Sequence, residues 1–112
     1  MSSLADNKCE ACRIDAPLLS MDERKRYLSE LEDWTIEESS INKLSKTYNF
    51  DNYNSAVKFA NAVANIADKE DHHPQIILEW GKVSIIWWSH KIKGLHKNDF
   101  ICAAKTDLAF NI

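Results

Sequence analysis

The sequence has little of several features that would define a class of protein. Its 112 residues include only two glycines, two prolines and three cysteines. No apolar run approaches the roughly 18 to 20 residues of a membrane span. The formal net charge of −3 provides no basic surface for nucleic acid. There is no low-complexity tract, internal repeat or interdomain linker. With 45% apolar and 28% charged residues, the composition is that of a globular protein of one domain.

The three cysteines form no recognisable metal site. Cys9 and Cys12 make a C-x-x-C near the start of the chain, and Cys102 lies alone in an apolar pattern. A zinc site normally has four ligands, and no second C-x-x-C or spaced histidine pair completes this one. A redox motif would be expected at a strand-to-helix turn, which is also missing. We therefore expect no metal, and we expect Cys102 to be a core residue.

The start of the chain differs in character from the rest. Residues 1–17 read as a flexible leader ending at Pro17, and residues 18–112 as a single domain. Met1 to Lys8 lack the charged-then-apolar arrangement of a secretory signal, so the cytoplasm is the expected compartment.

The spacing of apolar residues predicts three helices and four strands. Ser20 with Glu23 predicts a capping box for the first helix, and Asp51 an N-cap for the second. The element order predicts an α+β fold, α-β-β-α-β-β-α, in which a four-stranded antiparallel sheet has its helices packed on one face. The expected helices are Met21–Glu32, Asn52–Asp68 and Lys97–Phe110; the expected strands are Trp34–Glu37, Ile41–Phe50, Gln75–Trp80 and Lys82–Ser89.

Three of the four histidines are predicted to meet at one end of a hairpin. His72 and His73 precede Pro74, which ends helical geometry there, and His90 ends the last strand. Facing residues of an antiparallel hairpin have indices with a constant sum. A tight turn at Trp80 and Gly81 makes that sum 161 or 162, which puts His90 opposite Asp71 or His72.

Three uses of these imidazoles remain open from the residues alone. They could ligate a metal, although no H-E-x-x-H pattern is present. They could be structural. They could transfer protons to and from a bound small molecule, since histidine titrates near neutrality, with Asp68 or Asp99 orienting a ring. His96, near the expected start of the last helix, reads as a surface or capping residue.

The spaced set as a whole resembles the pterin-4a-carbinolamine dehydratase family, and its leader resembles that of bacterial members. The pattern is an acidic residue, three spacers, His-His-Pro, a third histidine sixteen residues after the proline and an aspartate nine residues later. The resemblance runs from about Leu19 to the C-terminus and also covers Trp34 and Gly94-Leu95. One departure is Ile76, where family members often carry an aromatic residue. The matching positions are Asp68, His72, His73, Pro74, His90 and Asp99.

The resemblance implies a function. Water would be removed from a 4a-hydroxytetrahydropterin to give the quinonoid dihydropterin, recycling the pterin of aromatic amino acid hydroxylases such as phenylalanine hydroxylase. The implied catalytic set is His72, His73 and His90, with His72 and His90 in proton transfer and His73 binding the pterin. Asp68 and Asp99 would be supporting groups and Trp34 a pocket wall. No metal or organic cofactor is implied.

Two further expectations concern partners. The alternative function is a module that binds pterin or another protein, like the dimerisation cofactors of the same family, without this enzyme role. The strand Lys82–Ser89 has apolar residues on both faces, so we expect a homodimer or homotetramer with Trp87 or Trp88 near a subunit contact. No membrane or nucleic-acid partner is expected.

Overall fold

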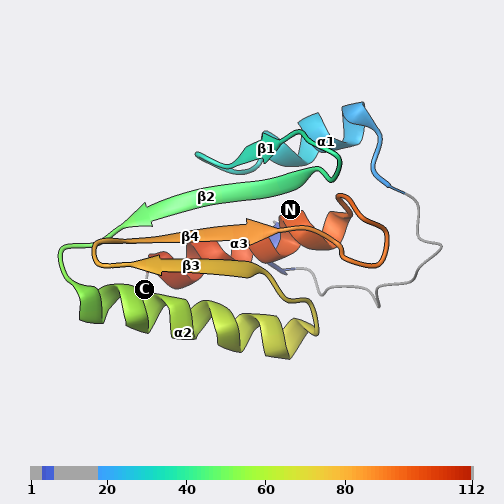
Figure 1. Cartoon of the computed structure of the whole chain (residues 1–112). Coiled ribbons are helices and arrows are strands. Elements are labelled where there is room, and N and C mark those ends of the chain that lie inside the picture. The colour runs from blue at the N-terminus through green and yellow to red at the C-terminus, as the bar shows by residue number, and fades with distance from the viewer. Residues whose placement is uncertain (1–3, 7–17, 112) are drawn as a thin grey trace.

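The computed structural model describes residues 4–6 and 18–111. Cys9 and Cys12 lie outside the described residues. Three helices and four strands follow one another in the predicted order, and all neighbouring strands are antiparallel, which confirms the predicted fold class (Figure 1). The strand order across the sheet is β1-β2-β4-β3. The elements are α1 (Met21–Leu28), β1 (Thr35–Glu37), β2 (Lys43–Asn49), α2 (Tyr53–Glu70), β3 (Gln75–Glu79), β4 (Lys82–Trp87) and α3 (Lys97–Phe110).

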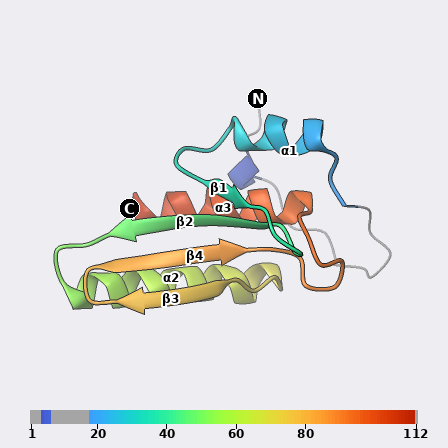
Figure 2. The same ribbon diagram turned by 45° about the horizontal axis from the view of Figure 1, so that its top comes forward.

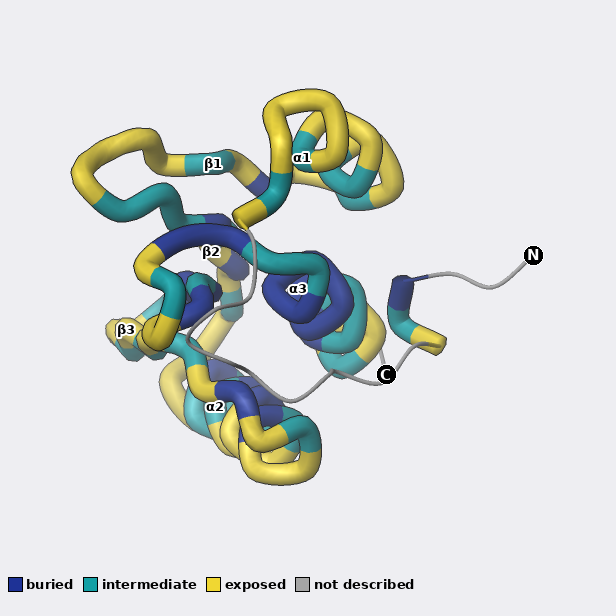
Figure 3. The backbone as a smooth tube through the Cα atoms, turned by 90° about the vertical axis from the view of Figure 1, so that its right-hand side faces the viewer, coloured by how far each residue is buried: buried dark blue, intermediate teal, exposed yellow. Residues whose placement is uncertain are grey.

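The helices cover one face of the sheet. Figure 2 shows α2 behind β3 and β4 and α3 behind β2, and Figure 3 shows the helices on one side of the strands. None of the helices in the described ranges is both long and apolar enough to cross a bilayer.

The core lies between the sheet and the two long helices. From β4, Val83, Ile85 and Trp87 point toward the helices and are fully buried. Because antiparallel partners share a face, β2 contributes Leu44 and Tyr48 to the same layer. Helix α2 supplies a stripe of residues at spacings of three and four, and α3 supplies a larger buried surface; these residues are Ala56, Phe59, Val63, Ala67, Phe100, Ile101, Cys102 and Ala103. Cys102 is buried in this core, as predicted.

The opposite face of the sheet is mostly polar. On β4 it carries Ser84 and the buried Ile86, and their partners on β2 are Thr47 and Ser45. Trp87 lies in the chain's own core, so it is not available for a subunit contact. Of the two tryptophans predicted near such a contact, only Trp88 remains available.

The helix starts follow the sequence signals more closely than the ends. Ser20 and Glu23 form the predicted capping box. Asn52, not Asp51, caps α2, because its Oδ1 accepts from Ser55 N at 2.8 Å. Helix α1 ends at Leu28, four residues before the predicted Glu32. The chain tightens after Ser29, since Glu30 N donates to Tyr27 O and Leu31 N to Leu28 O, each three positions back.

Residues 4–6 form a short 3-10 turn, η1 (Leu4–Asp6), within the predicted leader. Leu4 is buried against α3 and belongs to the main hydrophobic core.

Candidate functional site

The end of α2 places the two neighbouring histidines in the turn that leads into β3. Asp71 caps the helix in the left-handed conformation, with φ of 51°, and His72 N donates back to Ala67 O at 3.1 Å. Pro74 then leads into β3. His72 and His73 therefore occupy the turn between helix and strand, where the alternation of a strand does not separate their side chains.

The hairpin register brings the third histidine to the same place. Gln75 pairs with Ile86 and Glu79 with Lys82, so the sum of paired indices is 161, one of the two predicted values. The turn is the two residues Trp80 and Gly81. His90 lies just past the end of β4, and its Nε2 donates to His73 O at 3.3 Å. The predicted juxtaposition of His90 with the histidine pair is confirmed.

The three imidazoles line one depression. Its volume is about 360 Å³, and its walls are His72, His73, His90, Asp71 and Lys91. It sits where α2 gives way to β3 and where β4 runs into the following loop. Among the described residues, no group of three or more His, Cys, Asp or Glu side chains is arranged to hold a metal ion.

His72 is held by a buried carboxylate. Its Nε2 lies 2.6 Å from Asp99 Oδ1, and the side chains of the two residues are 6% and 0% exposed. The other oxygen of Asp99, Oδ2, accepts from Ser89 Oγ and from His96 N, both at 2.9 Å. An ionised carboxylate can only accept hydrogen bonds, so we place a proton on His72 Nε2. This leaves Nδ1 as the ring nitrogen able to exchange a proton.

Trp87 fixes the plane of the His72 ring. The two rings are stacked, with centroids 5.6 Å apart and planes within 9° of parallel. The indole is itself fixed, because Nε1 donates to Thr106 Oγ1 at 3.2 Å. His72 is therefore constrained both by its carboxylate partner and by a rigid aromatic wall.

His73 is held more loosely than His72. Its Nε2 lies 3.1 Å from Asp68 Oδ1, and the two side chains are 58% and 83% exposed. This contact lies in solvent, where polar side-chain pairs contribute little to stability. His73 can therefore adjust its position to a bound molecule.

His90 is the third imidazole, and Trp88 supports it. The two ring centroids lie 4.4 Å apart, and Lys43 Nζ lies 4.4 Å from the Trp88 centroid. Because a backbone carbonyl only accepts, the bond to His73 O puts a proton on His90 Nε2 and leaves its Nδ1 to exchange protons. Ile76, where the resembled family often has an aromatic residue, pairs with Ile85 and packs on the core instead.

Two residues that help to hold His72 and Asp99 in place were not predicted from the sequence, because their contacts form only in the tertiary structure. Ser89 and Trp87 were not singled out for this role, although both lie within three residues of His90. His96 caps α3 as predicted, since its Nδ1 accepts from Asn98 N at 3.1 Å. Asp99 therefore has two roles: it caps the start of α3, and it orients His72.

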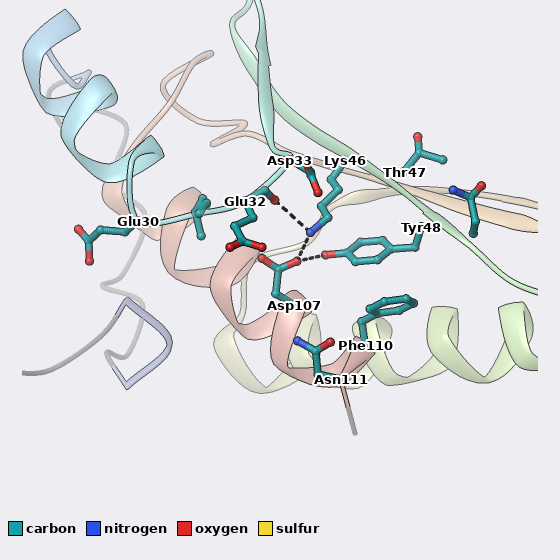
Figure 4. A pocket seen from close by; sticks show the side chains of 11 residues that line it. Glu30, Glu32, Asp33, Lys46, Thr47, Tyr48, Asp107, Phe110 and Asn111 are labelled. Atoms are coloured by element: carbon teal, nitrogen blue, oxygen red, sulfur yellow. Dashed lines mark hydrogen bonds and ion pairs between the residues drawn. The ribbon is translucent and has the colours of Figure 1, made fainter.

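Trp34 does not line the histidine depression. Its Nε1 donates to Asp107 Oδ2 at 3.0 Å. Asp107 lines a different cavity, of about 570 Å³, together with Lys46 and Tyr48 (Figure 4). Asp107 also accepts from Lys46 Nζ at 2.8 Å and from the Tyr48 hydroxyl. Burial and this carboxylate raise the pKa of Tyr48 well above its usual value.

We therefore expect Trp34→Phe to affect stability rather than substrate binding. The variant loses the hydrogen bond to Asp107, and its free energy of unfolding should fall by about 1–3 kcal/mol in urea titrations. The KM of any activity of the histidine site should not change. Trp80→Phe is the control, because Trp80 is 69% exposed at the hairpin turn and its change should alter neither quantity. A raised KM with unchanged stability in Trp34→Phe would instead indicate that Trp34 contributes to substrate binding.

Comparisons with known proteins agree with this architecture. The family model for pterin 4 alpha carbinolamine dehydratase matches residues 17–109. A protein of Vibrio vulnificus named "Putative pterin-4-alpha-carbinolamine dehydratase" is 55% identical over 105 residues, which are 93% of this chain and 96% of that one. A protein of Saccharophagus degradans with the same name is 48% identical over 108 residues, 96% of each chain.

Solved structures show the same fold at lower identity. A crystal structure titled transcriptional coactivator/pterin dehydratase, from Brucella melitensis, has a TM-score of 0.76 at 22% identity and covers 83% of this chain and 98% of its own. A pterin dehydratase-like protein, identified as a RuBisCO assembly factor in the alpha-carboxysome, has a TM-score of 0.59 at 22% identity and covers 70% and 89%.

Proposed function

Because the chain belongs to the pterin 4 alpha carbinolamine dehydratase family, we propose that it removes water from a 4a-hydroxytetrahydropterin to give the quinonoid dihydropterin. The observation that carries this proposal is the shared depression of His72, His73 and His90, with Asp99 buried behind His72. His72 and His90 each use Nε2 to contact an acceptor, and in both rings Nδ1 remains for proton exchange.

The reaction requires an acid and a base at one site. The C4a–O bond breaks as a proton is delivered to the leaving hydroxyl, and the N5 proton is taken up by a base, so that one water molecule leaves. We assign His72 and His90 to these two proton transfers. Asp99 orients His72 and stabilises the imidazolium that forms when Nδ1 takes up a proton, as a carboxylate does behind a catalytic histidine.

The remaining residues of the depression are assigned to binding. The His73 side chain is exposed, and its contact with Asp68 lies in solvent, so we assign it to hydrogen-bonding the polar edge of a pterin ring. Since only two protons and a hydroxide move, the proposed chemistry calls for neither a metal nor an organic cofactor.

The full-length protein should speed the dehydration of a 4a-hydroxytetrahydropterin. We would follow formation of the quinonoid product by its absorbance, generating the substrate in situ, with and without a metal chelator. The rate should rise in proportion to protein concentration and should be unchanged by chelator. A rate equal to the uncatalysed reaction would contradict the proposal, and loss of activity with chelator would contradict its cofactor-free form.

The physiological setting is part of the proposal. Dehydration would recycle the pterin cofactor of an aromatic amino acid hydroxylase such as phenylalanine hydroxylase, in the cytoplasm. A homodimer or homotetramer stays a prediction, with Trp88 as the tryptophan near a subunit contact.

A pterin-binding or protein-interaction module without this activity is the alternative. The same fold is found in a transcriptional coactivator/pterin dehydratase and in a pterin dehydratase-like RuBisCO assembly factor, so the fold by itself is compatible with either function. The same assay separates the two functions. A protein that binds a reduced pterin at the histidine depression without raising the rate would favour the alternative.

A further inference from the structure

A further depression lies at the loop that follows His90, and the charged residues that line it are both cationic. Its volume is about 190 Å³, and it lies between the segment that leads into α1, the β1–β2 connection and residues 93–95. Two cationic side chains, Arg24 and Lys93, line it, and none of its lining residues carries a carboxylate. In a chain with a net charge of −3, this is a locally positive cavity.

Arg24, one of the residues that line this cavity, carries an unused hydrogen-bond donor. Its Nε is buried and has no hydrogen-bond partner, and it is the sole buried side-chain nitrogen or oxygen without a partner within residues 4–6 and 18–111. Buried donors are almost always paired, and an unpaired donor on a charged group is unfavourable. Arg24 therefore brings a positive charge and an unsatisfied donor to a cavity that Lys93 also lines, and this combination favours an anionic acceptor.

Neutral donors complete the lining. Ser40 and Asn42 line the cavity from the β1–β2 connection, and Ser39 lies beside them with its hydroxyl donating to Ile41 O at 2.8 Å. A guanidinium presents a planar fork of N–H groups that matches two oxygens of a carboxylate or phosphate, and an ammonium adds a point charge.

The cavity is built on fixed backbone. Leu19 N donates to Leu95 O at 3.2 Å, and a Cβ on Gly94 would lie 2.6 Å from Leu18 Cδ2, so a larger residue there would require the exposed Leu18 side chain to move. Lys93 adopts the left-handed conformation, with φ of 53°. The positions of both cations are thus tied to the packing of the segment before α1 against the loop after β4.

We propose that this cavity binds a small oxyanion, the phosphate or carboxylate group of a metabolite, through Arg24 and Lys93. The site is separate from the histidine depression, and no residue lines both. The loop from Ser89 to Gly94 connects them, closed by a backbone bond from Ser89 N to Gly94 O at 2.8 Å. The proposal goes beyond the dehydratase function and does not depend on it.

Nuclear magnetic resonance of the full chain with inorganic phosphate tests the site directly. The chain has only two glycines, Gly81 and Gly94, and only three arginines. The amide signal of Gly94 and the Nε–H signal of Arg24 should shift with saturation as phosphate is added at constant ionic strength. The Gly81 amide, at the hairpin turn, should not shift. A parallel titration with acetate distinguishes a phosphate site from a carboxylate site.

Variants separate a specific site from general charge attraction. Arg24→Gln and Lys93→Gln should each weaken phosphate binding about tenfold or more. Arg26→Gln removes the same charge from the same helix but lies outside the cavity, so affinity should be unchanged. Arg24→Lys keeps the charge without Nε–H and should also bind weakly. Unchanged Gly94 and Arg24 signals with both anions, or equal losses in Arg24→Gln and Arg26→Gln, would overturn the proposal.

Discussion

Replacing His72 or His90 with alanine should lower kcat/KM for dehydration of the carbinolamine by about a hundredfold or more, the usual contribution of a positioned general acid or base. The two imidazoles line one depression, and each has one ring nitrogen oriented by an acceptor. The measurement is initial-rate kinetics across a range of pH values, since loss of the acid or of the base should remove one limb of a bell-shaped profile.

The fourth histidine supplies a control for these variants. His96 caps α3 through Nδ1 and lies outside the histidine depression. Asparagine is also a good N-cap, so His96→Asn removes an imidazole while keeping the cap. Its activity should equal that of the unaltered protein. Full activity in a His72→Ala, His90→Ala double variant would contradict the assignment of proton transfer to these residues.

Asp99→Asn should be the most informative single change, because it alters a proton position without altering shape. Ser89 Oγ and His96 N both donate to Oδ2, so the amide oxygen of asparagine will occupy that place. The amide nitrogen then faces His72 Nε2 and cannot accept from it. The proton of His72 must move to Nδ1, which removes the nitrogen that exchanges protons with the substrate.

We expect kcat of Asp99→Asn to fall by about a hundredfold or more, as in His72→Ala, because Asp99 acts through that imidazole. The free energy of unfolding should fall by only about 1–3 kcal/mol. Nitrogen-15 shifts of the His72 ring would report the change of tautomer. The double variant Asp99→Asn, His72→Ala should have the same kcat as His72→Ala alone, because the two residues act as a unit.

Asp107→Asn provides the matched control. Asp107 is a second carboxylate that accepts three side-chain donors, and it lies outside the histidine depression. Its change should lower stability and leave kcat/KM unchanged. If Asp107→Asn and Asp99→Asn reduced activity equally, the lower activity of Asp99→Asn would result from impaired folding rather than from a changed tautomer of His72.

The sequence determined the features that depend on neighbouring residues. The capping box of Ser20 and Glu23, the alanine-rich stripe of α2 and the two-residue turn at Trp80 and Gly81 each follow from residues close along the chain. The turn also fixed the hairpin register, and through it the approach of His90 to the histidine pair. Such local patterns determine which face of a helix or strand a side chain occupies, since the helical and strand periods are constant.

Ambiguous local signals limited the same reasoning. Asp51 and Asn52 are both good caps, and the choice depends on how the chain enters α2 from β2. The end of α1 had no strong stop signal, so its predicted boundary fell four residues too late.

Contacts between distant segments required the tertiary structure. Asp99 meets His72 across 27 positions and Trp34 meets Asp107 across 73, and Arg24 shares a cavity with Lys93. These pairs depend on the placement of β4 between β2 and β3 and on where α3 and α1 pack against the sheet. A one-dimensional pattern specifies which face a side chain occupies, whereas its partner on another element is set by the packing of the whole core.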